Sequence, residues 1–451
     1  MAWGDVVLHR DADTWWRGGS VDPMLAGMPS SRKRRRRAPL TQAQLKQRRQ
    51  RERRQPEREL VATLRPGQSL EHLLTEDDHA AMEAEMNASA RGDARLAWEH
   101  HMSGLVVEES MHRHRLREIV DLGGDAPGWV YSRWCLDQAY RWMLVSRDLR
   151  ADDMVRVVLG ATHLDHVEQL MDRPTALTEY GTLVAASDWL TEQLCLYTAG
   201  GLRDFLDVRA EPGLLEHADL VREWAGAWLG VHQLEEIRGP ALVVRNLVDN
   251  AVCEVLNLGA FNERSPDVAL GRVVPISTPP FHMFDSRPVP LDPETALHAA
   301  EVMRGPDELA WLDALSAGRD AGRLQRGFSC TQQTMYSSDL VVELPAHEPH
   351  NADPPGRMRE LLAAGLDEHV ANGVMVAEVA LIAARVSDGA AAVVAPHLAT
   401  ALVDSRVFAA VLTHCAGEEQ EGPWRRLAAS TWSPVRERCL EIAKRSGPHA
   451  A

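Results

Sequence analysis

The spacing of apolar residues changes at one point along the chain, and this change limits the folds open to it. Over residues 69–238, apolar side chains recur every three or four positions, which is the period of a helix with one buried face. At Gly239-Pro240 the period falls to about two, which is typical of β-strands. Helical spacing returns at Asp292. The sequence therefore predicts a mainly α protein, with helical hairpins in two lobes and a small β unit, roughly residues 240–290, between them.

The length of the chain predicts several segments. At 451 residues it exceeds what a single hydrophobic core usually organises, and its apolar share of 45% is that of a globular protein. We predict a basic, largely disordered arm at 1–66, a helical domain at 67–238, the β unit at 239–291 and a C-terminal helical domain at 292–451.

Gly, Asp and Pro residues delimit the helices expected in the first lobe. One helix is predicted over 151–171 and another over about 175–197. A third is predicted through VREWAGAWLGVHQLEE, which places Trp224 and Trp228 on one face. These helices, joined by short turns, indicate stacked helical hairpins.

Aromatic residues gather in the segment WVYSRWCLDQAYRWMLV. Trp129, Trp134 and Trp142 fall there at or near helical spacing, beside Tyr131 and Cys135. Such a cluster could line a ligand cage, but apolar packing in a core explains the same spacing more simply. We therefore expect these tryptophans to belong to the core.

The β unit is expected to contain three strands. ALVVRNL and AVCEVLNLG flank residues 248–250, which suit a hairpin loop. VALGRVVPI is predicted as a third strand at the edge of the sheet, because Pro275 has no N–H to donate. Asp292 followed by Pro293 then indicates the start of a helix, with Asp292 as its N-cap.

A dense cationic segment precedes the helical region. From Arg32 to Arg58 there are 13 Lys and Arg residues against Glu52 and Glu57, a net charge of +11. The whole chain carries −16, so the remainder carries −27. The side chains expected to contact phosphate are Arg32, Lys33, Arg34, Arg35, Arg36, Arg37, Lys46, Arg48, Arg49, Arg51, Arg53 and Arg54.

This cationic segment predicts binding to nucleic acid or another polyanion, with a strong salt dependence. It contains no aromatic residue, so neither base stacking nor sequence-specific contact is expected. Two other interpretations fit the same charge pattern. In one the segment is a solvated tail; in the other it docks on the acidic remainder of its own chain or on an acidic protein partner.

Several enzyme classes lack their required residues. Lysine occurs at Lys33, Lys46 and Lys444 alone, and there is no GxxxxGK[ST] motif, which argues against pyridoxal enzymes, P-loop NTPases and protein kinases. Neither GxSxG nor GxGxxG occurs. We expect no cofactor, and the leading interpretation is a non-enzymatic helical scaffold or binding protein.

Histidine pairs supply the enzymatic alternative. His163 and His166 lie three residues apart on a predicted helix, so both could bind one metal ion of a metal-assisted hydrolase. There is no HExxH motif and no evident third ligand. His112 and His114 are two residues apart, which places them on different helix faces. Among 19 histidines such pairs arise by chance, so no metal site is expected.

Cysteine usage and hydropathy bear on the compartment. The six cysteines are widely spaced without a CxxC pair, which is typical of reduced core residues. The N-terminus shows no signal-peptide pattern, and the apolar run from Val374 to Val386 is interrupted by Glu378 and Arg385. The sequence therefore predicts a cytoplasmic protein that does not enter a membrane.

Three segments carry a resemblance to other proteins. They are AWEHHMSGLVVEESMHRHRLREIV, APGWVYSRWCLDQAYRWML and the LVVRNLVDN…LGRVVPI unit. Their combination resembles large helical proteins of actinobacteria that have no defined activity, over about half of the chain. The resemblance implies an architecture and no activity. Some of those relatives carry a C-terminal cysteine-rich metal motif, which this chain lacks.

Overall fold

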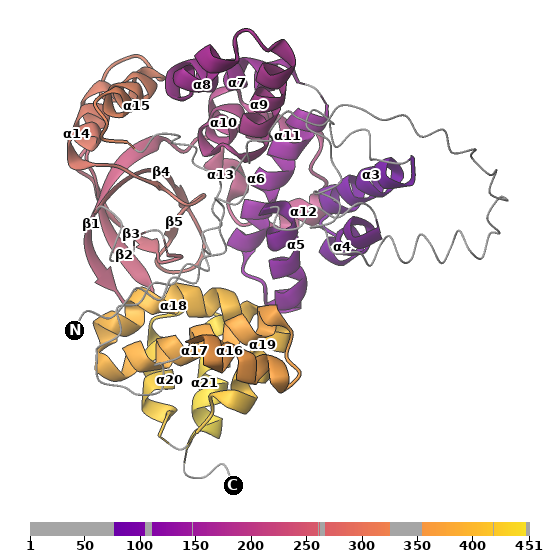
Figure 1. Cartoon of the computed structure of the whole chain (residues 1–451), viewed down its shortest axis with the longest axis vertical. Helices are drawn as coiled ribbons and strands as arrows, with labels where there is room; N and C mark the ends of the chain where they lie inside the picture. The colour runs from indigo at the N-terminus through magenta and orange to yellow at the C-terminus, as the bar shows by residue number, and fades with distance from the viewer. Residues whose placement is uncertain are drawn as a thin grey trace, which may run out of the picture. The chain divides into compact units, whose positions relative to one another are not determined.

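The computed structural model describes residues 76–103, 111–146, 148–259, 261, 267–324, 354–417 and 419–447 (Figure 1). These residues belong to one unit of the chain. They are 65% helical and include one small antiparallel sheet, so the prediction of a mainly α protein with a small β unit is confirmed. The cationic segment at 32–58 lies outside the described residues.

Helices dominate the chain from Glu76 to Trp224. They are α3 (Glu76–Ala90), α4 (Ala94–Ser103), α5 (Met111–Leu122), α6 (Gly128–Val145), α7 (Leu149–Thr162), α8 (Leu164–Leu170), α9 (Pro174–Ser187), α10 (Trp189–Gln193), α11 (Gly201–Val208), α12 (Pro212–His217) and α13 (Val221–Trp224). A single 3-10 turn follows α5, and a π-helical turn follows α10.

Two helices predicted as continuous are broken. The one predicted over 151–171 ends at His163, whose backbone (φ −120°, ψ 17°) leaves the helical region, and α8 follows. The one predicted over 175–197 is interrupted at Asp188, where the backbone is extended and the carboxylate accepts from the N–H groups of Leu190 and Thr191. Asp188 thus caps α10, and a cap inside an apolar run cannot be read from periodicity.

Two of the three tryptophans of α6 lie in the core, as expected. Trp129 and Trp134 are fully buried, and Trp142 is half-buried. Cysteines behave as expected where they are described: Cys135, Cys195, Cys415 and Cys439 are buried, Cys253 is half-buried, and all five are free. Cys330 lies outside the described residues.

The sheet has the strand order β3-β2-β1-β4-β5, with β6 pairing β4. Its strands are β1 (Leu229–Arg238), β2 (Ala241–Asn246), β3 (Val252–Leu256), β4 (Val268–Pro275), β5 (His282–Phe284) and β6 (Val289–Pro290). All pairings are antiparallel, and the sheet curls so that β5 approaches β3 (Figure 1). Leu242, Val244, Val255 and Phe284 fill its inner face.

The structure corrects two predictions about this sheet. The helix predicted through VREWAGAWLGVHQLEE ends at Trp224, and β1 begins at Leu229, because pairing with β2 and β4 on both sides overrides local helical spacing. Trp224 is buried, whereas Trp228 is 79% exposed. β4 is also not an edge strand. It pairs with β1 and β5, and Pro275 is tolerated because it is the last residue of the strand.

The rest of the described chain is helical. It comprises α14 (Pro293–Val302), α15 (Ala310–Asp320), α16 (Pro354–Ala363), α17 (Glu368–Val386), α18 (Asp388–Val403), α19 (Ser405–His414), α20 (Glu421–Ala429) and α21 (Val435–Arg445). Asp292 caps α14, as predicted, by accepting from the N–H groups of Glu294 and Thr295. Val158 of α7, Leu270 of β4 and Leu312 of α15 share one hydrophobic core.

One helix of the described chain is long and apolar enough to cross a bilayer by length and composition. It is α17, and the bent α18–α19 pair meets the same criteria if taken as a single span. Most of the apolar stretch of α17 is buried against neighbouring helices, as in the core helix of a globular domain. The apolar run from Val374 to Val386, which was predicted not to span a membrane because Glu378 and Arg385 interrupt it, lies within α17.

Candidate metal centre

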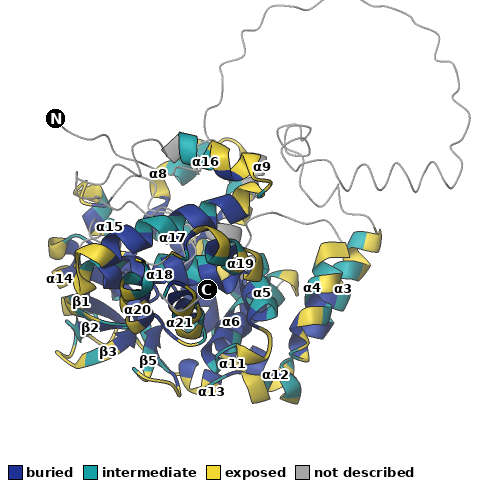
Figure 2. Cartoon of the chain, turned by 90° about the horizontal axis from the view of Figure 1, so that it is seen from below, coloured by how far each residue is buried: buried dark blue, intermediate teal, exposed yellow. Residues whose placement is uncertain are grey.

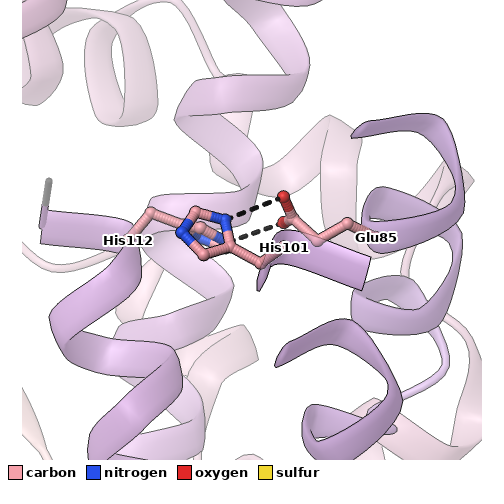
Figure 3. A group of neighbouring side chains, drawn as sticks. All are labelled: Glu85, His101 and His112. Carbon is pink, nitrogen blue, oxygen red and sulfur yellow. Dashed lines mark hydrogen bonds and ion pairs between the residues drawn. The ribbon is translucent and has the colours of Figure 1, made fainter. Parts of the chain in front are cut away.

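Three helices near the start of the body bring metal-ligating side chains together. Glu85 comes from α3, His101 from α4 and His112 from α5 (Figure 3). One potential ligand atom from each lies within 4.8 Å of the others. Among the described residues, this is the group that combines at least three such side chains at this distance. We call it the Glu85–His101–His112 centre.

Small residues allow the helices around the centre to approach closely. The buried apolar side chains of α3 and α4 are alanines, namely Ala88, Ala90, Ala94 and Ala97. Between the helices, Gly92 adopts φ +81°, which suits glycine and lets the chain reverse within three residues. The reversal places α4 beside α3, so that His101 lies next to Glu85.

Glu85 is the hub of the centre. Its side chain is 2% exposed, and its Oε1 lies 2.6 Å from His112 Nε2 while its Oε2 lies 3.4 Å from His101 Nδ1. Arg141 of α6 donates to both carboxylate oxygens, at 2.7 and 3.2 Å. Burial raises the pKa of Glu85, but hydrogen bonds with both histidines and the charge of Arg141 outweigh it, so the pKa lies well below its usual range.

His112 lies between two carboxylates. Its Nδ1 is hydrogen-bonded to Asp137 of α6, so its Nε2 points to Glu85. Burial and Arg141 lower the pKa of His112, but the two carboxylates outweigh them and the pKa is raised. A histidine held at one nitrogen by a carboxylate, with the other nitrogen presented to a site, is the arrangement found around metal-binding histidines.

His101 closes the centre on its outer side. Its side chain is 12% exposed, and its ring stacks on Trp98, with centroids 6.0 Å apart. The Nε2 atom of His101 is buried and has no hydrogen-bond partner. A buried imidazole nitrogen without a partner is costly. A bound water would relieve that cost, whereas an ion bonded to Nδ1, the nitrogen beside Glu85, would not.

Charged groups continue inward from the centre. Arg115, three residues after His112 on α5, is buried, and its Nε and Nη1 have no hydrogen-bond partner. Burial and the neighbouring Arg133 lower the pKa of Arg115. Burial raises the pKa of Glu192 to about 8, with Arg115 opposing the shift and Asp137 adding to it. The region between α5, α6 and α10 is therefore a buried ionic core.

The histidines singled out in the sequence lie elsewhere. His163 Nδ1 is 2.8 Å from the Tyr180 hydroxyl, and His163 Nε2 is 3.1 Å from Asp188 Oδ2, so protein groups bond both nitrogens. His166 stacks on Tyr180, with ring centroids 5.3 Å apart. Neither residue belongs to the Glu85–His101–His112 centre.

Sequence reasoning missed the centre. Its ligands are 16 and 11 residues apart on three helices, so no local spacing signals them. His112 was noted only beside His114, whose side chain lies outside the described set. One signal was present: the acidic Asp137 lies among the aromatic residues of the α6 sequence, where a partly buried charge needs a partner.

Comparison with protein-family models, curated proteins and solved structures finds no match to this chain. Functional inference therefore depends on the geometry described above.

Proposed function

We propose that this protein is a helical binding protein that holds one divalent transition-metal ion, of the zinc class, at the Glu85–His101–His112 centre. The observation that supports this most directly is the convergence of two imidazoles and one carboxylate within 4.8 Å, with Glu85 and His112 buried and His101 half-buried. Alignment of His112 by Asp137 adds to it.

The donor set favours zinc over the hard cations. Two nitrogens and one carboxylate oxygen make up the three-ligand set of many zinc sites, which keep a fourth position for water or another ligand. Magnesium and calcium prefer six or more oxygens. With zinc–ligand bonds of about 2.1 Å, tetrahedral ligand atoms lie roughly 3.4 Å apart. Glu85 Oε1 and His112 Nε2, which are 2.6 Å apart, would therefore separate to admit the ion.

Arg141 is hydrogen-bonded to the Glu85 carboxylate, which a bound metal ion would also contact. It donates to both oxygens of Glu85, yet each oxygen keeps a second lone pair. An ion would replace the protons that the two imidazoles share with Glu85, and Arg141 would remain as a charge on its far side. Arg141 should therefore lower metal affinity without blocking the site.

Direct metal binding tests this proposal. The metal-free full-length chain should bind about one equivalent of Zn²⁺ or Co²⁺. Calorimetry measures binding of either ion, and the visible absorption of Co²⁺ reports its coordination. His112→Ala and Glu85→Gln should each weaken binding at least 100-fold. His100→Ala, the adjacent histidine outside the centre, is the matched control and should bind as the wild type does. Equal binding by all four proteins would contradict the proposal.

The same proposal covers architecture. We propose that the helical hairpins form two lobes, one around α3–α6 and one around α16–α21, in the general architecture of the actinobacterial proteins that the sequence resembles. Packing of α17 against α18, α19 and α20 supports the second lobe. A scaffold of this kind, acting in the cytoplasm, is the context that we propose for the metal centre.

We further propose that the cationic segment at 32–58 binds nucleic acid or another polyanion without sequence preference. Its net charge of +11 and its lack of aromatic residues support this. Deleting 32–58 should abolish binding to arbitrary DNA or RNA. If about 6 phosphates are engaged, log K against log salt should have a slope of about −5 for duplex DNA. Sequence-selective binding that survives the deletion would place recognition in the body.

A further inference from the structure

We infer that metal loading controls the docking of the α3–α4 hairpin (Glu76–Ser103) onto α5 and α6. This inference rests on the proposed metal-binding function and adds a regulatory consequence to it. The hairpin is the first described part of the chain after the cationic segment. Its attachment therefore determines how the start of the body is held.

Apolar contacts attach the hairpin only weakly. Its buried residues are four alanines together with Glu85 and Ser89, and no larger aliphatic or aromatic side chain of α3 or α4 is fully buried. Alanine removes little apolar surface from water compared with leucine or tryptophan. In Figure 2 most of α3 and α4 is half-buried or exposed, whereas α18 is mostly buried.

The turn of the hairpin is attached through the backbone. The Glu211 N–H donates to the Ala90 carbonyl at 2.9 Å, next to the start of α12. A Cβ atom added to Gly213 would lie 2.6 Å from the Arg91 carbonyl oxygen, so the two backbones are in close contact. These contacts hold the turn whether or not an ion is bound.

The Glu85–His101–His112 centre joins the two sides, and a hydrogen bond from Arg209 to Asn87 is a further attachment of α3. Glu85 and His101 belong to the hairpin, whereas His112 and Arg141 belong to α5 and α6. A metal ion bonded to all three ligands would cross-link the hairpin to α5. Releasing the hairpin from α5 would then require release of the ion, so metal binding and docking are thermodynamically linked.

The linkage between metal binding and hairpin docking predicts how much hydrogen exchange should slow. If opening of the hairpin releases the ion, amide hydrogen exchange in α3 and α4 should slow by the factor 1 + [Zn²⁺]/Kd. At a free Zn²⁺ concentration 100 times Kd, the slowing is about 100-fold. Amides of α17 and α18 that exchange by local opening, which leaves the centre intact, should not change.

The experiment is hydrogen–deuterium exchange of the full-length wild-type chain, with and without Zn²⁺, alongside calorimetry on the same sample. We expect slowing confined to the hairpin and its partner helix α5, increasing with free Zn²⁺. His101→Ala should abolish the slowing of α4, and His100→Ala should preserve it. Zn²⁺ binding without slower exchange in α3 and α4 would overturn this inference and leave metal binding intact. Absence of Zn²⁺ binding would overturn both.

Discussion

The helices α17 and α18 bury a different kind of side chain from the helices α3–α6. Every fully buried residue of α17 and α18 is apolar or glycine, from Val370 to Val403. The α3–α6 region buries apolar side chains too, but it also buries the charged or polar Glu85, His112 and Arg115. Apolar burial is favourable without any ligand, whereas a buried charge is tolerated only beside a partner. The stability of α3–α6 should therefore respond to metal and pH, and that of α17 and α18 should not.

This difference also decides what the two regions can do. The buried face of the α17–α18 pair gains its stability from apolar packing, which requires neither a bound proton nor a metal ion. A buried ionic cluster can exist in more than one bonded state, because a proton or a metal ion can occupy the same position between its ligands. Sensitivity to a ligand is thus expected in α3–α6.

The largest expected effect comes from removing the hub of the ionic cluster. Glu85→Ala leaves Arg141 and His112 without their shared carboxylate, so the free energy of unfolding should fall by about 3–5 kcal/mol. Urea unfolding of the metal-free protein measures this. Glu83→Ala, at an exposed position two residues away, should change it by less than about 0.5 kcal/mol. A small loss for Glu85→Ala would mean that the cluster is solvated.

A cavity in the apolar pair should have a slightly smaller effect. Leu398→Ala in α18 removes a fully buried side chain, so the free energy of unfolding should fall by about 3 kcal/mol. The loss should be the same with and without Zn²⁺ and between pH 5 and pH 8, in contrast with changes in α3–α6. Leu297→Ala, 63% exposed on α14, is the control. A loss that depends on Zn²⁺ would erase the distinction between the regions.

Glu192 should make the stability of the ionic region depend on pH. Its pKa is about 8 in the folded chain against 4.5 as the ordinary value. Between these values the folded state holds a proton that the unfolded state has lost, so stability decreases as pH rises. Glu192→Gln should remove this slope and stabilise the protein by about 2 kcal/mol at pH 8.5, with little change at pH 4.5.

Urea unfolding at several pH values measures the Glu192 effect, and Glu216→Gln, at an exposed carboxylate, is its control. A Glu192→Gln variant that keeps the slope of the wild type would assign the pH dependence to another group.

Arg141 should give the smallest of these effects. Arg141→Gln removes a positive charge that opposes a divalent cation at Glu85, so Zn²⁺ affinity should rise about tenfold, or about 1.4 kcal/mol. Competition with a chelator measures the affinity. Arg150→Gln, an arginine paired with Asp148 and Asp204 outside the centre, should leave it unchanged. Weaker binding by Arg141→Gln would instead show that Arg141 orients Glu85 for the metal.

The same two regions show how far sequence reasoning reaches. Periodicity predicted the mainly helical fold, the strands β2 to β4 and the buried Trp134, and the Asp292-Pro293 pair predicted the cap of α14, because each depends on local sequence. The prediction was wrong at β1, because its apolar spacing is helical and its pairing with β2 and β4 is not visible in the local sequence. The Glu85–His101–His112 centre was not predicted, because its three residues meet only through tertiary packing.

The central position of β1 determines where this chain can be divided. A fragment ending near residue 238, where the period of the sequence changes, would keep β1 but lose both of its hydrogen-bonding neighbours. A fragment ending before Leu229 would leave the remaining strands without their middle member. A fragment ending after β6 would lack α14 and α15, which share a hydrophobic core with α7 and β4. Expression of the first helical region should therefore extend at least to Asp320.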